Sequence, residues 1–224
     1  MRTLSHFIGG QSVAGASGRF GDVFDPNTGK VQARIKIGFS SYGLAFGAGS
    51  VWVTSESDGT VRRVNPRKNR VSAKIKAGSQ PNGVVYAFGA LWVADLGGGR
   101  VLKIDVKRNK VVARYPVPQA DWITPSADAL WVSGESNEVV RLDPATGAIT
   151  AHVPVGHNPL ASTWIAGDLW VPNIDDGTIS VIDPATNAVR TTFPAGSGTL
   201  AVAETAGDAW VSASNDGEIW RIRP

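Results

Sequence analysis

Apolar residues recur along this chain as a short cluster centred on a tryptophan. The cluster reads Val51-Trp52-Val53 at its first occurrence and Leu91-Trp92-Val93 at its second. The five tryptophans of this kind are 40, 39, 39 and 40 residues apart: Trp52, Trp92, Trp131, Trp170 and Trp210. A turn sequence such as Asp25-Pro26 keeps the same period, in steps of 40, 40, 38, 40 and 40 residues. Two marks with one period predict an internal repeat of about 40 residues.

The unit from 41 to 78 shows which elements one repeat contains. Its apolar segments predict four strands, at 42–46, 51–54, 60–64 and 71–77. Asp58-Gly59 separates the second strand from the third and is a strong hairpin signal. Asn65-Pro66 begins the turn before the fourth strand, where Pro presets φ and Asn69 accepts the left-handed conformation. Each repeat is therefore predicted to be a four-stranded antiparallel meander.

The pattern within the strands indicates how the repeats pack. The last strand of a repeat alternates apolar and charged residues, as Ala73 and Ile75 alternate with Lys74 and Lys76. Such alternation is typical of an outer edge that resists pairing with another molecule. The tryptophan strand is apolar on both faces, so both faces must be covered. Radially stacked sheets meet both conditions, and the predicted fold class is all-β, a β-propeller of four-stranded antiparallel blades.

The repeats are interpreted as one domain, residues 1–224. Four full blades cover 41–78, 79–118, 119–156 and 157–196, and a three-stranded last blade covers 197–224. Residues 1–38 contain third and fourth strands but have Ser12 where the tryptophan belongs, which makes them a degenerate or borrowed first blade. Six blades are preferred. In the five-bladed alternative, the strand at 31–37 closes the last blade and residues 1–28 lie outside the ring.

The repeat resembles a known one. Leu169-Trp170-Val171, the stretch Asp-Gly-Thr-Ile-Ser-Val-Ile-Asp-Pro-Ala-Thr-Asn-Ala-Val at 176–189 and Pro-Ala-Gly at 194–196 are similar to the YVTN-type β-propeller repeat. That repeat is shared with the virginiamycin B lyase-like family, and the resemblance covers residues 40–224. It implies a binding or structural propeller. It also implies an enzyme class, because the antibiotic lyase is a metal-dependent enzyme that uses histidine and glutamate on one face.

The first 36 residues resemble another family. Phe7-Ile8-Gly9-Gly10, Ser17-Gly18-Arg19 and the stretch 25–34 are similar to the amino terminus of methylmalonate-semialdehyde dehydrogenase. The chemistry of that family is not expected here, because the chain has no cysteine to act as nucleophile and no Gly-x-Gly-x-x-Gly loop after a strand. We expect a natural or artificial fusion in which the borrowed hairpin serves as a blade.

Charge is divided along the chain, although the formal net charge is only +3. Residues 61–114 contain 13 Lys and Arg against 2 Asp, a balance of +11, and residues 119–224 contain 4 Arg against 13 Asp and Glu, a balance of −9. One side of the ring is then basic and the other acidic. The basic run contains no recognised nucleic-acid reader motif, so no nucleic-acid partner is expected.

Other classes are disfavoured by composition. The absence of cysteine excludes disulfides and thiolate metal sites. No apolar run approaches the roughly 18 residues that span a bilayer, and Met1 to Gly10 lacks the apolar region of a secretory signal. We expect a soluble, cytoplasmic monomer with no membrane contact.

Candidate binding residues lie in the loops that lead into the inner strands and in the loops that join second to third strands. In a propeller both sets open on one face, around the central channel. The candidates are Tyr42, Glu56, Asp95, Trp122, Glu135, His157 and Asn173. This aromatic and acidic set suits a small cationic or polar molecule with an apolar body, or a protein partner. Trp122 is the strongest candidate, because other repeats have small residues in its loop.

The sequence favours a non-catalytic binding or scaffold module without a cofactor. A metal-dependent lyase is the first alternative, in which His157 and Glu135 or Glu56 hold a divalent ion. Mg²⁺ or Ca²⁺ would also suit the pair Asp175-Asp176. An artificial fusion propeller with no ligand is the second alternative. Turnover that needs metal and is lost in His157→Ala would favour the lyase, and metal-free binding lost in Trp122→Ala would favour the binding module.

Overall fold

The computed structural model describes residues 5–8, 11–14, 21–24 and 29–223, with side chains from residue 29 onward. Its regular structure is strand, apart from two short 3-10 turns, η1 (Glu56–Asp58) and η2 (Leu96–Gly98). The predicted all-β class is confirmed. Among these residues there is no helix with the length and apolar character needed to cross a membrane.

Five antiparallel sheets follow one another along the chain, each built from strands in sequence order. We number them sheet 1 (β5–β8), sheet 2 (β9–β12), sheet 3 (β13–β16), sheet 4 (β17–β20) and sheet 5 (β21–β23). The first strands are β5 (Ser41–Gly47), β9 (Pro81–Ala87), β13 (Ala120–Pro125), β17 (Thr163–Ile165) and β21 (Thr199–Thr205). The second strands are β6 (Ser50–Ser55), β10 (Ala90–Asp95), β14 (Leu130–Gly134), β18 (Asp168–Asn173) and β22 (Asp208–Ala213).

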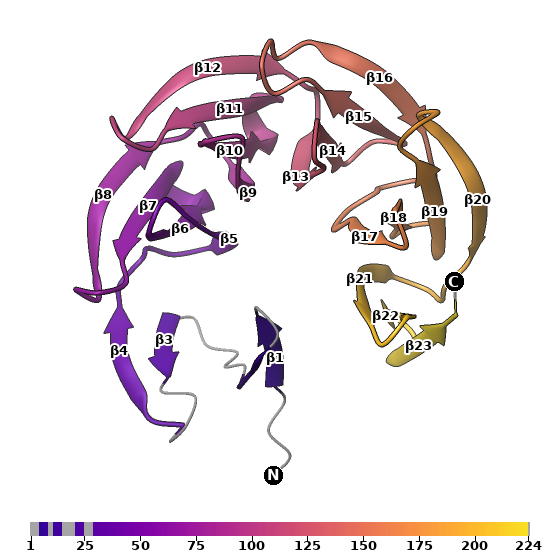
Figure 1. Cartoon of the computed structure of the whole chain (residues 1–224), viewed down its shortest axis with the longest axis horizontal. Coiled ribbons are helices and arrows are strands. Elements are labelled where there is room, and N and C mark those ends of the chain that lie inside the picture. Colours follow the sequence, from indigo (N-terminus) through magenta and orange to yellow (C-terminus); the bar gives the residue numbers. More distant parts are fainter. Residues whose placement is uncertain (1–4, 9–10, 15–20, 25–28, 224) are drawn as a thin grey trace.

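The remaining strands complete the sheets. The third strands are β7 (Thr60–Asn65), β11 (Arg100–Asp105), β15 (Glu138–Leu142), β19 (Thr178–Asp183) and β23 (Glu218–Ile222). The fourth strands are β8 (Arg70–Lys76), β12 (Lys110–Pro116), β16 (Ile149–Pro154) and β20 (Ala188–Pro194). The sheets lie around a common centre, with first strands innermost and fourth strands on the periphery (Figure 1). The architecture is propeller-like, and the arc of sheets 1–5 is open between sheet 5 and sheet 1 (Figure 1).

Four strands precede sheet 1 and form two separate pairs. β1 (Ser5–Ile8) pairs with β2 (Gln11–Ala14), and β3 (Gly21–Phe24) pairs with β4 (Val31–Ile35). β4 therefore does not lie in the sheet of β21–β23, where the five-bladed alternative placed it. Much of the segment that resembles the dehydrogenase terminus lies outside the described residues.

The apolar core lies between neighbouring sheets. Trp52 and Val61 of sheet 1 pack in one cluster with Leu91 and Val93 of sheet 2. In the described part of the chain, each of the four boundaries between consecutive sheets has such a cluster. The repeated Trp strand needs cover on both faces, and in sheets 2–4 the two neighbouring sheets provide it. Burial of one large apolar side chain contributes about 1.5–3 kcal/mol.

In four of the sheets, a Lys or Arg side chain of the third strand lies over the indole ring of the repeat tryptophan. Trp52 is opposite Arg63 in the register of β6 and β7, and the guanidinium carbon lies 4.9 Å from the centre of the indole ring. Arg63 Nη1 also donates a hydrogen bond to the Val106 carbonyl of sheet 2, at 2.8 Å. The corresponding contacts in other sheets are Lys103–Trp92, Arg141–Trp131 and Arg221–Trp210. Each contributes about 0.5–1 kcal/mol where it is exposed and more where water is excluded.

The predicted turns between third and fourth strands are present. Asp105 Oδ1 accepts hydrogen bonds from the backbone N–H groups of Lys107 and Arg108, at 2.8 and 3.0 Å. These bonds hold the pKa of Asp105 below its usual value. Asn109 at the end of the turn has a φ of 55°, the left-handed conformation that the sequence predicted.

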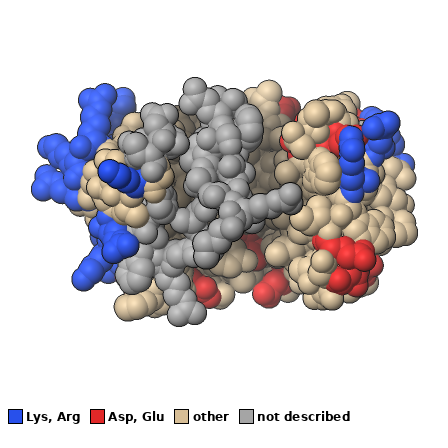
Figure 2. All heavy atoms as spheres, turned by 90° about the horizontal axis from the view of Figure 1, so that it is seen from below, with Lys and Arg blue, Asp and Glu red and all other residues tan. Residues whose placement is uncertain are grey.

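The two signs of charge are separated in space as well as in sequence. Figure 2 views the molecule from the open side of the arc. Lys and Arg gather on the side of β4 and β8, whereas Asp and Glu lie mainly toward sheet 5, where basic side chains are also present (Figure 2). On this face the side of β4 and β8 is basic, as the sequence predicted, whereas the side of sheet 5 has both signs of charge (Figure 2).

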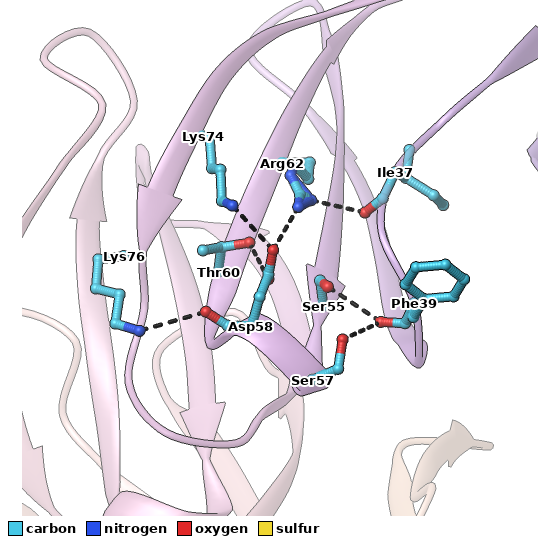
Figure 3. A network of polar contacts seen from close by, with 9 residues as sticks. All are labelled: Ile37, Phe39, Ser55, Ser57, Asp58, Thr60, Arg62, Lys74 and Lys76. Atoms are coloured by element: carbon cyan, nitrogen blue, oxygen red, sulfur yellow. Dashed lines mark hydrogen bonds and ion pairs between the residues drawn. The ribbon is translucent and has the colours of Figure 1, made fainter.

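A polar network anchors the connection between β4 and β5 (Figure 3). The Ile37 carbonyl accepts from Arg62 Nη1 at 2.8 Å, and the Phe39 carbonyl accepts from the hydroxyls of Ser55 and Ser57. Arg62 also donates to Asp58 Oδ2 at 2.5 Å. The connection is therefore fixed to the hairpin of β6 and β7 from Ile37 onward.

Candidate functional site

The loops that lead into the first strands contact the loops that follow the second strands. In sheet 1 the Glu56 N–H donates to the Ser40 carbonyl at 3.0 Å, and in sheet 2 the Leu96 N–H donates to the Gln80 carbonyl at 3.0 Å. Sheets 4 and 5 have the equivalent bonds, from Ile174 to Asn158 and from Ser214 to Gly198. Both sets of loops therefore lie at one end of the sheets, as the sequence pattern predicted.

The innermost strands of sheets 1, 2 and 3 approach closely at this end. A Cβ on Gly43 would lie 2.3 Å from the Asn82 carbonyl oxygen, and a Cβ on Gly83 would lie 2.6 Å from the Asp121 carbonyl oxygen. Thr54 Oγ1 accepts from the Gly43 N–H at 2.7 Å and donates to the Asn82 carbonyl at 2.8 Å. Glycine at these two positions is thus a packing requirement.

This close approach brings three equivalent repeat positions together, those of Tyr42, Asn82 and Asp121. In each sheet, the first residue of the first strand pairs with the last residue of the second strand. These pairs are Ser41–Ser55, Pro81–Asp95 and Ala120–Gly134, and Tyr42, Asn82 and Asp121 are the next residues along the chain. Asn82 Nδ2 donates to Asp121 Oδ1 at 2.8 Å, across the boundary between sheets 2 and 3. The positions form a row along the inner end of the arc.

Asp121 is a buried carboxyl in this row, with 5% of its surface exposed. Burial raises its pKa, the charges of Glu135 and Glu56 raise it further, and only the hydrogen bond from Asn82 opposes them. Asn82 is also buried, at 4% exposure, and its Oδ1 accepts no hydrogen bond from the described residues. A buried acceptor without a donor costs about 1–3 kcal/mol.

Tyr42 lies beside these carboxyls with 53% of its surface exposed. Its pKa is raised, first by partial burial and then by the negative charges of Asp121, Glu56 and Glu135. We call Tyr42, Glu56, Asn82, Asp121 and Glu135 the acidic mouth. Three of the sequence candidates, Tyr42, Glu56 and Glu135, thus lie at the same end of the sheets.

Asp95 and Asn173 occupy equivalent positions at the ends of second strands, and both are fully buried. Asp95 Oδ1 accepts from the N–H groups of Ser79 and Gln80, at 2.9 and 3.0 Å, and Arg100 Nε donates to Asp95 Oδ2 at 2.9 Å. Asn173 Nδ2 donates to the hydroxyls of Thr178 and Ser180, both at 2.9 Å. These contacts brace the loops and leave neither side chain a surface for a ligand.

Trp122 and His157 are not among the residues of the acidic mouth. Trp122 is half-buried on β13, opposite Ser133. His157 has a side chain that is 70% exposed, and its Nδ1 lies 2.8 Å from Asp176 Oδ1. The Asp176 carboxylate also accepts from the His157 N–H at 2.8 Å, and these bonds hold the Asp176 pKa below its usual value.

A divalent-metal site with His157 does not fit this arrangement. His157 contacts Asp176 rather than Glu56 or Glu135, and Asp176 is used by the backbone and ring of His157. From residue 29 to residue 223, no three His, Asp or Glu side chains converge in a way that would hold a metal ion. The donor set required by the lyase alternative is therefore not assembled by the described residues.

Comparison with known proteins adds no family. The chain matches no family model and none of the curated proteins. The site is therefore argued from its own geometry. Asp121 and Asn82 are the mouth residues that the sequence reasoning missed, and the signal that could have found them is their alignment with Tyr42 at one position of the repeat.

Proposed function

We propose that the protein is a non-catalytic binding module that holds a small organic cation at the acidic mouth. The observation that carries this proposal is the buried Asp121, bonded to Asn82 at the inner end of the arc, with Tyr42, Glu56 and Glu135 at the same end of the sheets. Their charges raise the pKa values of Asp121 and Tyr42, and no Lys or Arg of the described residues is among the causes of either shift. A bound cation would relieve this repulsion, which gives it a favourable electrostatic contribution.

The other groups of the mouth suit an ammonium or guanidinium group attached to an apolar body. The half-exposed Tyr42 ring offers a π face to a cation. Since the carboxyls are not clustered as metal ligands, an organic cation that spans them is favoured over Mg²⁺ or Ca²⁺.

The proposal includes the architecture around the mouth. We place sheets 1–5 in a β-propeller of the YVTN type with six positions around its axis. The sixth position lies between sheet 5 and sheet 1, and β1–β4 lie toward it (Figure 1). The resemblance of residues 40–224 to that repeat supports this assignment, and so does the common strand order of the five sheets.

Calorimetric titration of the intact chain tests the function. The probes are 1,4-diaminobutane, tetramethylammonium and Ca²⁺, each titrated into the wild type and into Asp121→Asn. We expect at least one organic probe to bind, and Asp121→Asn to weaken it about tenfold, which corresponds to about 1.4 kcal/mol. Glu204→Gln is the matched control, because Glu204 pairs with Ala209 at the opposite end of its sheet from the mouth.

Three results would contradict the proposal. These are no binding of either organic probe, equal weakening in Asp121→Asn and Glu204→Gln, and binding of Ca²⁺ alone that is lost in Asp121→Asn. The last result would assign the mouth to a metal ion.

A further inference from the structure

An open cavity of about 840 Å³ lies at the boundary between sheets 1 and 2. Its walls include the turns that join first to second strands and third to fourth strands, so it lies at the end of the sheets opposite the acidic mouth. Arg63, Lys107 and Asp105 are its charged lining residues, and Tyr86 supplies an aromatic wall. We call this cavity the basic pocket.

Arg63 brings a positive charge to the basic pocket without a carboxylate partner. Its Nε donates to Ser50 Oγ at 2.8 Å, and its Nη1 donates to the Val106 carbonyl at 2.8 Å and to Asn109 Oδ1 at 3.1 Å. All three acceptors are neutral. Nη2 donates to none of the described residues, so its two N–H groups remain for a ligand. The guanidinium is also held over the Trp52 ring.

Other sheets of the repeat neutralise the arginine at this position. It is Arg141 in sheet 3 and Arg221 in sheet 5, each opposite its tryptophan. Arg141 is paired with Asp128 at 2.5 Å, and Arg221 is paired with Asp208. Asp208 is equivalent to Ser50, because each lies two residues before the tryptophan of its sheet. Sheet 1 thus has a hydroxyl where sheet 5 has a carboxylate.

The remaining charges leave the basic pocket with a balance of +1. Asp105 Oδ1 accepts from the backbone N–H groups of Lys107 and Arg108, and Arg108 Nε lies 3.8 Å from Asp105 Oδ2. The Lys107 side chain is exposed and stands as a second cation beside Arg63. Two positive charges against one match a monoanion better than a dianion.

Tyr86 gives the basic pocket an apolar wall with a fixed position. Its ring packs so closely on sheet 1 that a Cβ on Gly47 would lie 2.1 Å from it. At the boundary between sheets 2 and 3, Lys103 also has a neutral partner, the Pro144 carbonyl. There, however, Pro125 stands where sheet 2 has Tyr86. The boundary between sheets 1 and 2 therefore combines an unpaired cation with a ring on which an aromatic body can pack.

We propose that the basic pocket binds a small aromatic carboxylate. The carboxylate accepts from Arg63 Nη2 and from the Lys107 ammonium, and the aromatic body packs on Tyr86. The basic run of residues 61–114, with its balance of +11, raises the local concentration of such an anion. This site is opposite to the mouth in both position and charge, so it does not depend on the proposed function.

Titration of the intact chain with 4-fluorobenzoate, followed by fluorine NMR, tests the site. We expect the wild type to bind this probe, and Lys107→Gln to weaken binding about fivefold. Arg67→Gln is the matched control, because Arg67 is the equivalent residue in the turn of sheet 1, is exposed and does not line the basic pocket. Arg67→Gln and the mouth variant Asp121→Asn should bind as the wild type does.

Ser50→Asp tests the charge of Arg63 without removing the arginine. It supplies the carboxylate that sheet 5 has, and it should fold, because Asp208 and Ser50 are equally buried, at 4% exposure. We expect Ser50→Asp to weaken binding at least about tenfold, and Ser50→Ala to bind within about twofold of the wild type. Melting curves check that each variant folds.

Four results would overturn the proposal. The first is a wild type that does not bind 4-fluorobenzoate up to about 10 mM. The second is equal weakening in Lys107→Gln and Arg67→Gln. The third is a folded Ser50→Asp that binds as the wild type does. The fourth is tighter binding of inorganic phosphate than of 4-fluorobenzoate, which would assign the basic pocket to a different class of anion.

Discussion

Asn82 Nδ2 lies 2.8 Å from Asp121 Oδ1, and this hydrogen bond joins the innermost strands of two neighbouring sheets. It is the contact in the acidic mouth that lowers the Asp121 pKa, whereas burial, Glu135 and Glu56 raise it. The Asn82 amide thus compensates only part of the cost of the Asp121 charge.

Asp121→Asn is expected to stabilise the protein at pH 7. A carboxyl whose pKa is raised by folding favours the folded state below its unfolded pKa and loses that stability as pH rises through its folded value. An amide removes the charge and still accepts the bond from Asn82. A change of about 1 kcal/mol corresponds to about 2–4 °C in Tm. Thermal melts at pH 7 and pH 3.5 check this. The gain should be smaller at pH 3.5, and a loss at pH 7 would contradict it.

The Tyr42 phenol should titrate at higher pH than a free tyrosine. Ultraviolet absorbance of the wild type minus that of Tyr42→Phe isolates Tyr42 from Tyr86 and Tyr115. Glu56→Gln and Glu135→Gln should each move this pKa down, because each removes a charge that disfavours the phenolate. Glu204→Gln should leave it unchanged. Equal pKa values in all of these proteins would show that the carboxyls do not reach Tyr42.

Asp58→Asn is expected to destabilise the protein. Burial alone would raise the pKa of Asp58, but hydrogen bonds from Thr60 and Lys74 and the charge of Arg62 hold it well below its usual value. Because the folded pKa is depressed, the stabilisation is full above pH 4 and is lost as pH falls further. The side chain is 34% exposed, and with solvent screening we expect a loss of about 1 kcal/mol at pH 7.

Urea unfolding at pH 7 and pH 3 measures the Asp58 effect. Asp128→Asn is the control, because Asp128 pairs with Arg141 but is 67% exposed. The free energy of unfolding of Asp128→Asn should be lower than that of the wild type by less than about 0.5 kcal/mol. An equal loss in both variants would mean that the network around Asp58 is no stronger than a surface ion pair.

Gly43→Ala should be strongly destabilising, because its Cβ would lie 2.3 Å from the Asn82 carbonyl oxygen. Backbone must move to accommodate it, at a cost of about 1–3 kcal/mol. Ala201→Gly is the comparison, since Ala201 holds the equivalent position in sheet 5, and it should change the free energy of unfolding by less than about 1 kcal/mol. Urea unfolding measures both. A neutral Gly43→Ala would show that sheets 1 and 2 are not packed closely at the mouth.

The fold was predictable because the repeat marks the same local elements several times. The Trp strand fixed the core position, as the fully buried Trp52, Trp92 and Trp131 show, and the Asp and Asn turns fixed the hairpins. The closure of the ring was not predictable. Ile219 lies in the same sequence pattern as the buried Ile179. The pattern predicts that this face of the strand must be covered, but it does not predict which part of the protein covers it.

The candidate site was predictable only in part. Placing the loops at one end put Tyr42, Glu56 and Glu135 at the same end of the sheets. Asp95 and Asn173 were chosen by the same rule, but a polar side chain at the end of a second strand can turn inward to satisfy backbone N–H groups or hydroxyls, and both do so. Asp121 was passed over because its burial depends on packing between sheets, which local sequence does not encode.

The reach of Arg63 to the Val106 carbonyl has a mechanical consequence. Lys103 donates the same kind of hydrogen bond to the Pro144 carbonyl of sheet 3. These two bonds link sheets 1, 2 and 3 in series on the side opposite the mouth.

In sheet 3, Arg141 turns back to Asp128 instead, but the Trp164 indole of sheet 4 donates to the Pro125 carbonyl of sheet 3 at 2.8 Å. In sheet 4, Val181 is opposite Trp170, where the other sheets have a cation, so no such bond between described residues reaches sheet 5. Since each sheet is coupled only to its neighbours, the boundary that lacks such a hydrogen bond separates most easily. Under load the molecule should therefore open first between sheets 4 and 5, leaving sheets 1–4 together as the stiffer part.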